Sequence, residues 1–241
     1  MFPLLRRNFE WLRKRYRIPF NSVADVACGT GSFVRYLTQW NVPVFGIDRS
    51  LTMLNIAAQK NANKSVKLFC QDMRQLKLPQ PVDLITCNFD SLNYLLTIPD
   101  LSKAFHSFYR NLNRDGHLIF DMITSSWKEP GPSQYSRRFI APGVESHWFI
   151  SWDPRTKIRS VVINNDISGS RGICRREQEI HKERSYPINQ IIRLLRFCDF
   201  AVRGVRDAST LMPAGRATTR AVFVVRKLLL NNSGTKRLEW G

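Results

Sequence analysis

The sequence lacks any run of apolar residues that could cross a membrane, and it lacks a secretory leader. No stretch of its 241 residues approaches the roughly 18 consecutive apolar residues that a membrane-spanning helix requires. The N-terminus has no apolar segment followed by a small-residue cleavage site. From this pattern we expect no spanning helix and no cleaved signal peptide, and we expect a soluble protein of the cytoplasm.

Cysteines occur in none of the spacings that are typical of metal sites or disulfide frameworks. There are five, an odd number, and no two form a Cys-x-x-Cys pair. Four of the five lie inside apolar runs, where a free thiol packs like a small hydrophobic side chain. The sequence therefore predicts reduced thiols, with no disulfide bond and no metal site.

Acidic residues are few relative to basic ones. The chain has 19 Asp and Glu residues against 37 Lys and Arg residues, a formal net charge of +18. A field of this sign attracts anions. Because the basic residues are spread along the chain, a solvated basic surface is the simpler interpretation, and contact with nucleic acid or an acidic partner is the alternative.

The first half of the chain alternates short apolar runs with helical patterns. Apolar runs that predict strands end near residues 28, 48, 72, 87 and 122, and apolar residues spaced three and four apart predict helices after the first, second and fourth of them. Strands that alternate with helices indicate a parallel sheet covered on both faces. The length allows one such domain with a sizeable core and an insertion.

The predicted organisation of the chain has four parts. Residues 1–20 begin with a basic amphipathic helix, whose apolar stripe we expect to pack on the rest of the protein. Residues 21–126 and 186–228 form the α/β domain. Residues 127–185 show strand-like alternation and turn residues, which predicts an inserted antiparallel sheet. Residues 229–241 have the composition of a frayed tail.

Three aspartates lie at the ends of the first three predicted strands. Asp25, Asp48 and Asp72 are separated by 23 and 24 residues, about one strand plus one helix each time. In an open α/β sheet, ligands bind at the carboxyl ends of the strands. A ligand met by three carboxylates should be long and rich in hydroxyl and amino donors, and S-adenosylmethionine meets this requirement better than a nucleotide. Each aspartate alone could instead cap the next helix.

A glycine loop at residues 29–31 follows the first of these strands. The dinucleotide-binding fingerprint G-x-G-x-x-G would place a glycine or alanine at Val34, so the loop departs from it. The segment 25–31, Asp-Val-Ala-Cys-Gly-Thr-Gly, resembles instead the glycine-rich motif of class I S-adenosylmethionine-dependent methyltransferases, with Ala27 in place of the first glycine.

This resemblance implies a fold and a cofactor site. The fold is a doubly wound, seven-stranded, mostly parallel α/β sheet of the Rossmann-like methyltransferase type, whose last strand runs antiparallel. In that family the glycine loop passes under the methionine part of S-adenosylmethionine, and acids after the second and third strands bind the ribose and the adenine, roles that fall on Asp48 and Asp72. The residues implied to bind the cofactor are Asp25, Ala27, Cys28, Gly29, Gly31, Asp48, Arg49, Met53, Asp72, Met73, Asn88 and Phe89.

The likeness extends to a subgroup of small-molecule methyltransferases that includes amino-sugar N-methyltransferases. It rests on the order of the strands, on the β insertion, which would cover the active site, and on residues 181–186 before a helix. It implies direct transfer of a methyl group to a nitrogen or oxygen of a small acceptor, with S-adenosylhomocysteine as product and no need for a dedicated base. The acceptor-site candidates are Asp90, Tyr94, His181 and Tyr186.

Three hypotheses stay open from the sequence, and the first is a small-molecule methyltransferase, favoured by the insertion. An anionic acceptor would meet arginines such as Arg137 and Arg138. The net charge favours a methyltransferase that acts on RNA or protein, although no Asn-Pro-Pro-Tyr-like tetrad stands at residues 88–91. A non-catalytic module with the cofactor fold is the third, because relatives carry a further N-terminal lid over the cofactor, a role that residues 1–20 would have to fill.

Overall fold

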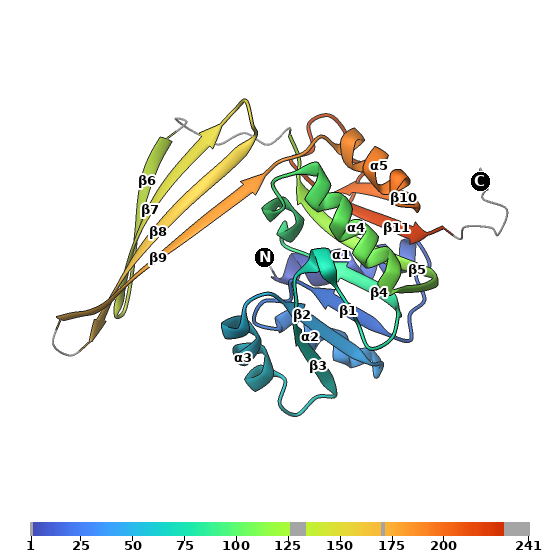
Figure 1. Cartoon of the computed structure of the whole chain (residues 1–241), viewed down its shortest axis with the longest axis horizontal. Coiled ribbons are helices and arrows are strands. Elements are labelled where there is room, and N and C mark those ends of the chain that lie inside the picture. Colours follow the sequence, from blue (N-terminus) through green and yellow to red (C-terminus); the bar gives the residue numbers. More distant parts are fainter. Residues whose placement is uncertain (1, 126–133, 170–171, 229–241) are drawn as a thin grey trace.

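The computed structural model describes residues 2–125, 134–169 and 172–228. It consists of an α/β domain and a separate four-stranded sheet (Figure 1). The helices are α1 (Phe2–Arg15), α2 (Ser32–Leu37), α3 (Leu51–Lys60), α4 (Ile98–Asn111) and α5 (Ile188–Phe197), with short 3-10 helices η1 (Thr38–Trp40), η2 (Met73–Gln75) and η3 (Ser91–Tyr94). The strands are β1 (Val23–Val26), β2 (Val44–Asp48), β3 (Val66–Cys70), β4 (Val82–Cys87), β5 (Leu112–Ile123), β6 (Gln134–Ala141), β7 (Val144–Asp153), β8 (Ile158–Gly169), β9 (Gly172–Arg184), β10 (Phe200–Asp207) and β11 (Arg220–Lys227).

Seven strands form the central sheet of the α/β domain, in the order β10-β11-β5-β4-β1-β2-β3. Neighbours among β1 to β5 pair in parallel, and β11 lies antiparallel between β5 and β10. This arrangement confirms the predicted doubly wound sheet with an antiparallel last strand. Because β1 to β4 are parallel, their carboxyl ends meet at one edge, which is where ligands bind in such sheets.

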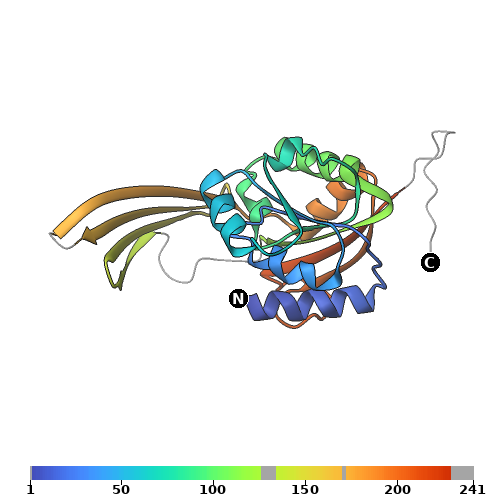
Figure 2. The same ribbon diagram turned by 90° about the horizontal axis from the view of Figure 1, so that it is seen from below.

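Helices cover both faces of this sheet. On one face, Phe105 of α4 and Leu195 of α5 are completely buried. On the other face, Phe9 and Leu12 of α1 are 2% and 1% exposed, and the Phe9 ring lies 5.4 Å from the Phe33 ring of α2. The apolar stripe of α1 therefore packs on its own domain, as predicted, because this burial removes large apolar side chains from water. Figure 2 shows α1 along one side of the domain.

A four-stranded antiparallel sheet, in the order β6-β7-β8-β9, lies between β5 and α5 in the chain. It confirms the predicted antiparallel insertion. Residues 126–133 and the predicted tail at 229–241 lie outside the described residues. Figures 1 and 2 show that the sheet extends away from the α/β domain instead of lying over it with one face. The strands β8 and β9 have 12 and 13 residues, which is roughly 40 Å at about 3.3 Å per residue. Figure 1 shows that most of this length lies outside the α/β domain.

The base of the inserted sheet is fixed by one buried side chain, that of Asn93 in η3. Asn93 is fully buried, and its amide group donates to the carbonyl of Arg184 at 2.7 Å and to that of Ile123 at 2.9 Å. The end of β9, the end of β5 and η3 are thereby held together. Within the described residues of the insertion, this end borders the carboxyl edge of the central sheet.

The described cysteine side chains are free thiols. Cys28, Cys87 and Cys198 are buried, and burial raises the pKa of each, whereas Cys70 is exposed. Within the described ranges, no group of three or more His, Cys, Asp or Glu side chains could hold a metal ion. No helix in that part of the chain is long and apolar enough to cross a membrane.

Candidate active site

The glycine loop between β1 and α2 has a left-handed backbone at every second residue. The φ angles of Ala27, Gly29 and Gly31 are 57°, 53° and 71°. Glycine adopts such angles without the steric cost that a Cβ brings, so Ala27 is the strained member of the motif. A Cβ on Gly31 would lie 2.8 Å from the Ala57 Cβ of α3, whereas a Cβ on Gly29 would meet no atom within 4 Å. Gly29 therefore faces open space, and Gly31 is a packing position.

Asp48, the last residue of β2, holds this loop against the sheet. Its Oδ2 accepts a hydrogen bond from the Gly29 amide at 2.8 Å, and its Oδ1 accepts one from the Ser50 amide at 2.9 Å. Ser50 in turn caps α3 by accepting from the Met53 amide. Each carboxylate oxygen has two lone pairs, so Asp48 keeps the capacity to accept from a further donor beside it.

Two cavities meet at the glycine loop, since Ala27 and Gly29 line both. Cavity A has a volume of about 590 Å³, and cavity B has a volume of about 630 Å³. All the residues predicted to bind the cofactor, except Gly31, line one or both of these cavities. Cavity A is lined by Asp25, Ala27, Cys28, Gly29, Asn88 and Phe89, and cavity B by Ala27, Gly29, Asp48, Arg49, Met53, Asp72 and Met73, among others.

Asp25 does not lie at the end of its strand, where the sequence pattern placed it. It lies inside β1 and is 3% exposed. Its Oδ1 accepts a hydrogen bond from the Thr86 hydroxyl at 2.7 Å and one from the Asn88 side-chain amide at 3.4 Å. Burial raises the pKa of Asp25 to about 7, and the Asp48 carboxylate acts in the same direction. Asp25 is thus a buried carboxyl group that orients Asn88 at the wall of cavity A.

The raised pKa of Asp25 predicts a pH-dependent stability. The group titrates near 3.8 in the unfolded chain and at about 7 in the folded protein. Its contribution to stability is complete below the unfolded value and is lost as the pH rises through the folded one, because the folded state resists ionisation. Urea titrations between about pH 4 and about pH 8 should show the free energy of unfolding falling more steeply with pH in the wild type than in Asp25→Asn, whose amide oxygen can still accept from Thr86. Parallel pH profiles would contradict this expectation.

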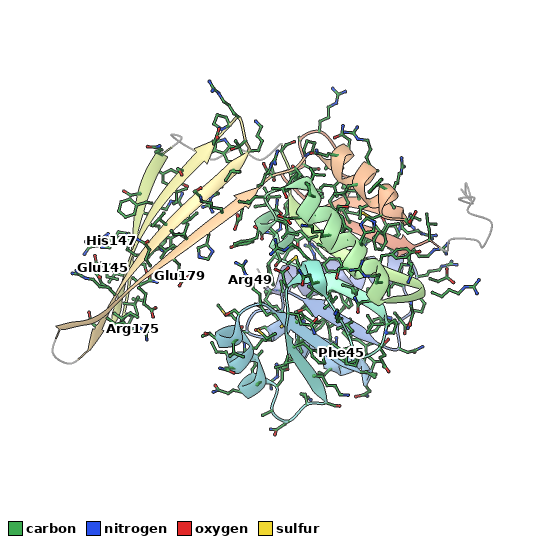
Figure 3. The ribbon with its side chains drawn as sticks, in the orientation of Figure 1. Phe45, Arg49, Glu145, His147, Arg175 and Glu179 are labelled. Atoms are coloured by element: carbon green, nitrogen blue, oxygen red, sulfur yellow. The ribbon has the colours of Figure 1, made fainter. Side chains whose placement is uncertain are left out.

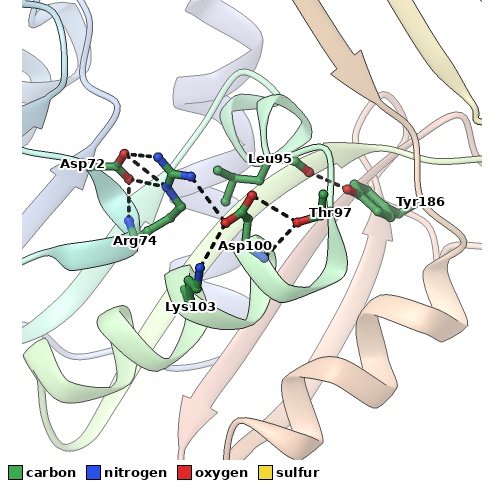
Figure 4. A network of polar contacts seen from close by, with 7 residues as sticks. All are labelled: Asp72, Arg74, Leu95, Thr97, Asp100, Lys103 and Tyr186. Carbon is green, nitrogen blue, oxygen red and sulfur yellow. Dashed lines mark hydrogen bonds and ion pairs between the residues drawn. The ribbon is translucent and has the colours of Figure 1, made fainter.

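Asp72, which follows β3, takes part in a network of ion pairs (Figure 4). It caps η2 by accepting from the Arg74 amide at 2.8 Å, and it pairs with the Arg74 guanidinium at 2.6 Å. The Arg74 guanidinium holds the pKa of Asp72 below its usual range. Arg74 also reaches Asp100 in the first turn of α4, at 3.4 Å. The adenine contact of Asp72 stays a prediction, and the network adds a role in tying β3 to α4 beside cavity B.

Tyr186 does not line cavity A or cavity B, contrary to its prediction as an acceptor contact. It is 1% exposed, and its hydroxyl donates to the carbonyl of Leu95 (Figure 4). Burial raises the pKa of Tyr186 to about 12. A buried tyrosine needs a partner for its hydroxyl, and here the partner is the backbone after η3. Tyr186 therefore positions the chain between β9 and α5 instead of touching a ligand.

The segment after β4 is held by a buried ion-pair network that the sequence analysis missed. Phe89 and Asp90 have φ angles of 58° and 52°, a conformation that is rare for residues other than glycine. Arg220 of β11 pairs with Asp90 at 3.0 Å and also with Asp121 of β5. Burial raises the pKa of Asp121, which is 7% exposed. Arg220 stands 130 positions from Asp90, so no local sequence signal could have identified it.

Tyr94 and His181, two of the predicted acceptor contacts, meet at cavity B and line it. The Tyr94 hydroxyl oxygen lies 3.1 Å from Nδ1 of His181. Nε2 of His181 lies 3.1 Å from the carboxylate of Glu179. Burial raises the pKa of Tyr94 and of Glu183, and the Glu183 carboxylate raises that of Tyr94 further. The sequence analysis missed both glutamates, although a spacing of two along a strand places them on the same face as His181.

The arginines expected to meet an anionic acceptor lie elsewhere. Arg137 and Arg138 belong to β6, at the opposite edge of the inserted sheet from β9. Arg138 pairs with Glu145 at 2.5 Å, and Arg137 lies over the ring of Tyr135. Neither lines cavity A or cavity B. Arg49 does line cavity B, and Figure 3 shows it at the edge of the α/β domain that faces the inserted sheet.

Comparisons with known proteins agree on one family. A model of the methyltransferase domain matches residues 23–116. A putative methyltransferase of Geobacillus sp. (strain WCH70) is 30% identical over 209 residues, which cover 85% of this chain and 84% of the relative. The dTDP-3-amino-3,6-dideoxy-alpha-D-glucopyranose N,N-dimethyltransferase of Streptomyces fradiae is 32% identical over 133 residues, 55% of this chain and 49% of that protein. The solved structure of an S-adenosylmethionine-dependent methyltransferase from Clostridium acetobutylicum ATCC 824 superposes with a TM-score of 0.80 at 24% identity, over 91% of this chain and 89% of that one.

The donor and acceptor groups at the glycine loop fit S-adenosylmethionine. Open space above Gly29 leaves room for a ligand against the backbone, and the Asp48 carboxylate faces cavity B with acceptor capacity to spare. The two cavities that meet at the loop would together accommodate a long ligand. With this geometry, and with a relative matched over most of both chains, the protein belongs to the class I S-adenosylmethionine-dependent methyltransferases.

Proposed function

We propose that this enzyme methylates an amine nitrogen of a small molecule bound beside Tyr94, in the part of cavity B that the cofactor would leave free. The observation that carries the proposal is the charge around that hydroxyl. Glu183 and Asp90 both act on Tyr94 electrostatically, and Glu179 lies behind His181. Three carboxylates thus lie near this hydroxyl, of which Asp90 is paired with Arg220, in a chain that has a formal net charge of +18. Such a group attracts a protonated amine and disfavours an anionic reacting group.

The names of two relatives support a nitrogen acceptor. The relative from Streptomyces fradiae and the dTDP-4-amino-2,3,4,6-tetradeoxy-D-glucose N,N-dimethyltransferase of Saccharopolyspora spinosa, 31% identical over 134 residues, are both named for methylation of an amino sugar. They match 55% of this chain each. An amino group on a small polar molecule is therefore the acceptor that we propose. Arg49 at cavity B is the group that would meet an anionic substituent elsewhere on such a molecule.

In the proposed reaction the protein mainly positions the two reactants. S-adenosylmethionine supplies a methyl group that is already activated on its sulfonium sulfur. The glycine loop and Asp48 would hold the cofactor. The ion pair between Arg220 and Asp90 would hold the segment after β4 in place between the cofactor and the acceptor. Because alignment of two bound groups supplies a large part of the rate enhancement, the rigid backbone at Phe89 and Asp90 serves the proposed chemistry directly.

The proposal is tested by methyl transfer from labelled S-adenosylmethionine to a panel of acceptors. The panel contains free amino sugars, their nucleotide-linked forms, simple aliphatic amines, and matched analogues that carry a hydroxyl in place of each amine. We expect label on amines and none on the matched hydroxyl compounds, because only an amine offers both a positive charge for the carboxylates and a nucleophilic lone pair after deprotonation. Label on the hydroxyl analogues alone would contradict the proposal.

The formal net charge of +18 favours one second candidate, methylation of RNA. A basic surface binds the phosphate backbone without regard to sequence. Total RNA therefore belongs in the same panel. Transfer of label to RNA, with none to any amine, would replace the small-molecule proposal.

A further inference from the structure

Tyr94, His181 and Glu179 form a continuous chain of polar contacts that begins in cavity B. Tyr94 lies in η3 and the other two lie on β9, so the chain spans the junction between the α/β domain and the inserted sheet. The two contacts are each 3.1 Å long. Tyr94 and His181 line the cavity, and Glu179 lies outward from it, with 55% of its side chain exposed. The chain thus leads from the cavity toward solvent.

The chemistry of the three groups fixes the direction of their hydrogen bonds. A carboxylate only accepts hydrogen bonds, so the short contact to Glu179 requires the proton of neutral His181 to sit on Nε2. Nδ1 is then an acceptor, and the Tyr94 hydroxyl donates to it. In this arrangement the Tyr94 oxygen donates its own proton to His181 and can accept a proton from a group in cavity B. The imidazole is ready to receive the Tyr94 proton.

We propose that Tyr94, His181 and Glu179 are a proton relay that deprotonates the acceptor amine. The relay rests on the proposed function, because its substrate is the ammonium form of that amine. The N–H bond of the ammonium breaks and its proton passes to the Tyr94 oxygen, while the Tyr94 proton passes to Nδ1 of His181. The nitrogen lone pair that is freed forms the bond to the methyl carbon, and the electron pair of the carbon–sulfur bond stays on sulfur as S-adenosylhomocysteine leaves. Tyr94 is the catalytic residue, and His181 and Glu179 act through it.

The groups around Tyr94 explain why its hydroxyl would transfer a proton without becoming ionised. Burial and the Glu183 carboxylate raise the pKa of Tyr94, so the hydroxyl stays protonated and passes protons instead of storing negative charge. Glu183 is a second acceptor for the Tyr94 hydroxyl in this structure, and it is the acceptor that remains once His181 carries two protons. The charged groups that face Tyr94, His181 and Glu183 are Glu179 on β9, Asp90 before η3, Arg49 after β2 and Arg159 on β8.

The first test needs no acceptor and reads the tautomer of His181 directly. The chain has four histidines, so ¹⁵N-histidine spectra of the protein with S-adenosylhomocysteine are simple, and His181→Gln assigns the resonance. We expect the Nε2–H tautomer for neutral His181, a change at Nδ1 in Tyr94→Phe, and a mixed tautomer in Glu179→Gln. The proposed relay would be overturned if neutral His181 carried its proton on Nδ1 in the wild type. It would also be overturned if neither Tyr94→Phe nor Glu179→Gln changed the His181 resonances.

The same spectra contain a matched control. His147 and Glu145 form a second histidine–glutamate pair two residues apart, with a contact of 2.6 Å, on the inserted sheet (Figure 3). Its resonance should not move in Tyr94→Phe or Glu179→Gln, because Tyr94 contacts His181. Glu177→Gln, which changes the preceding carboxylate on the same face of β9, should leave His181 unchanged. Movement of all histidine resonances together would indicate a structural change and would count against the relay.

The second test uses the amine identified with labelled cofactor. Tyr94→Phe and His181→Gln should lower kcat by roughly 100-fold or more, while the dissociation constant of S-adenosylhomocysteine is unchanged. The loss should shrink as the pH rises, because bulk solvent then deprotonates the amine without a relay; a purely structural defect would not recover. A large loss in Glu183→Gln with little loss in His181→Gln would overturn the relay in favour of Glu183. Failure of every amine as acceptor would refute the proposed function, whereas the tautomer test reports on the relay by itself.

Discussion

Arg220→Met is expected to lower the free energy of unfolding by on the order of 3 kcal/mol. The substitution removes the guanidinium that pairs with Asp121 and Asp90 and leaves Asp121, which is 7% exposed, without a counter-charge. Burial already raises the pKa of Asp121 in the presence of Arg220. The expected loss lies at the lower end of the range for buried pairs, since the Arg220 side chain is 27% exposed. Urea denaturation at neutral pH measures it.

A second ion pair of the same chemistry provides the control. Arg138 pairs with Glu145 through its Nε at 2.5 Å, but its side chain is 58% exposed. Arg138→Met should therefore cost less than about 1 kcal/mol. Adding Asp121→Asn to Arg220→Met should recover part of the stability, because an amide carries no charge into the interior. Similar small losses in both arginine variants would show that the Arg220 network is not a stabilising feature.

Asp48→Ala is expected to weaken the binding of S-adenosylhomocysteine by roughly 10-fold to 150-fold. The carboxylate lines cavity B, and hydrogen bonds to a charged group contribute about 1.5–3 kcal/mol each. Part of the loss would come from the loop, since Asp48 also accepts from the Gly29 amide. Asp48→Asn, which keeps an acceptor oxygen, should fall between the wild type and the alanine variant. Isothermal titration calorimetry measures the three affinities.

Asp83 is the matched control for this experiment. It also accepts from a backbone amide, that of Asn21 at 2.8 Å, but it is the second residue of β4 and lies at the opposite edge of the sheet. Asp83→Ala should leave the cofactor affinity within about twofold of the wild type. If both aspartate variants lost affinity equally, the loss would reflect general destabilisation, and the assignment of Asp48 to the cofactor site would fail.

Two predicted residues show where sequence patterns were sufficient and where they were not. Asp48 occupies the place that its spacing indicated, because the end of a parallel strand and the loop beside it are fixed by local alternation of strand and helix. Tyr186 was assigned to the acceptor because residues 181–186 resemble a segment of small-molecule methyltransferases, yet it is buried with its hydroxyl on Leu95. The burial of a residue depends on which side chains pack against it in the folded protein, and its neighbours in the sequence do not determine this.

From the sequence by itself came the central sheet, the glycine loop and, through the resemblance to methyltransferases, the residues expected to hold the cofactor, of which all but Gly31 line the two cavities. The alternation of strands and helices and the places of the aspartates follow from short-range rules: the period of apolar residues and the parallel direction of successive strands. The other cofactor residues were implied by the resemblance of the glycine loop to the family motif. The tertiary structure alone decided which distant groups meet. It brought Arg220 of the last strand onto Asp90 and placed Glu179 behind His181 and Tyr94. These contacts arise because strand pairing and side-chain packing join residues far apart in the chain, and their charges acquire partners only when the sheet and the insertion are complete.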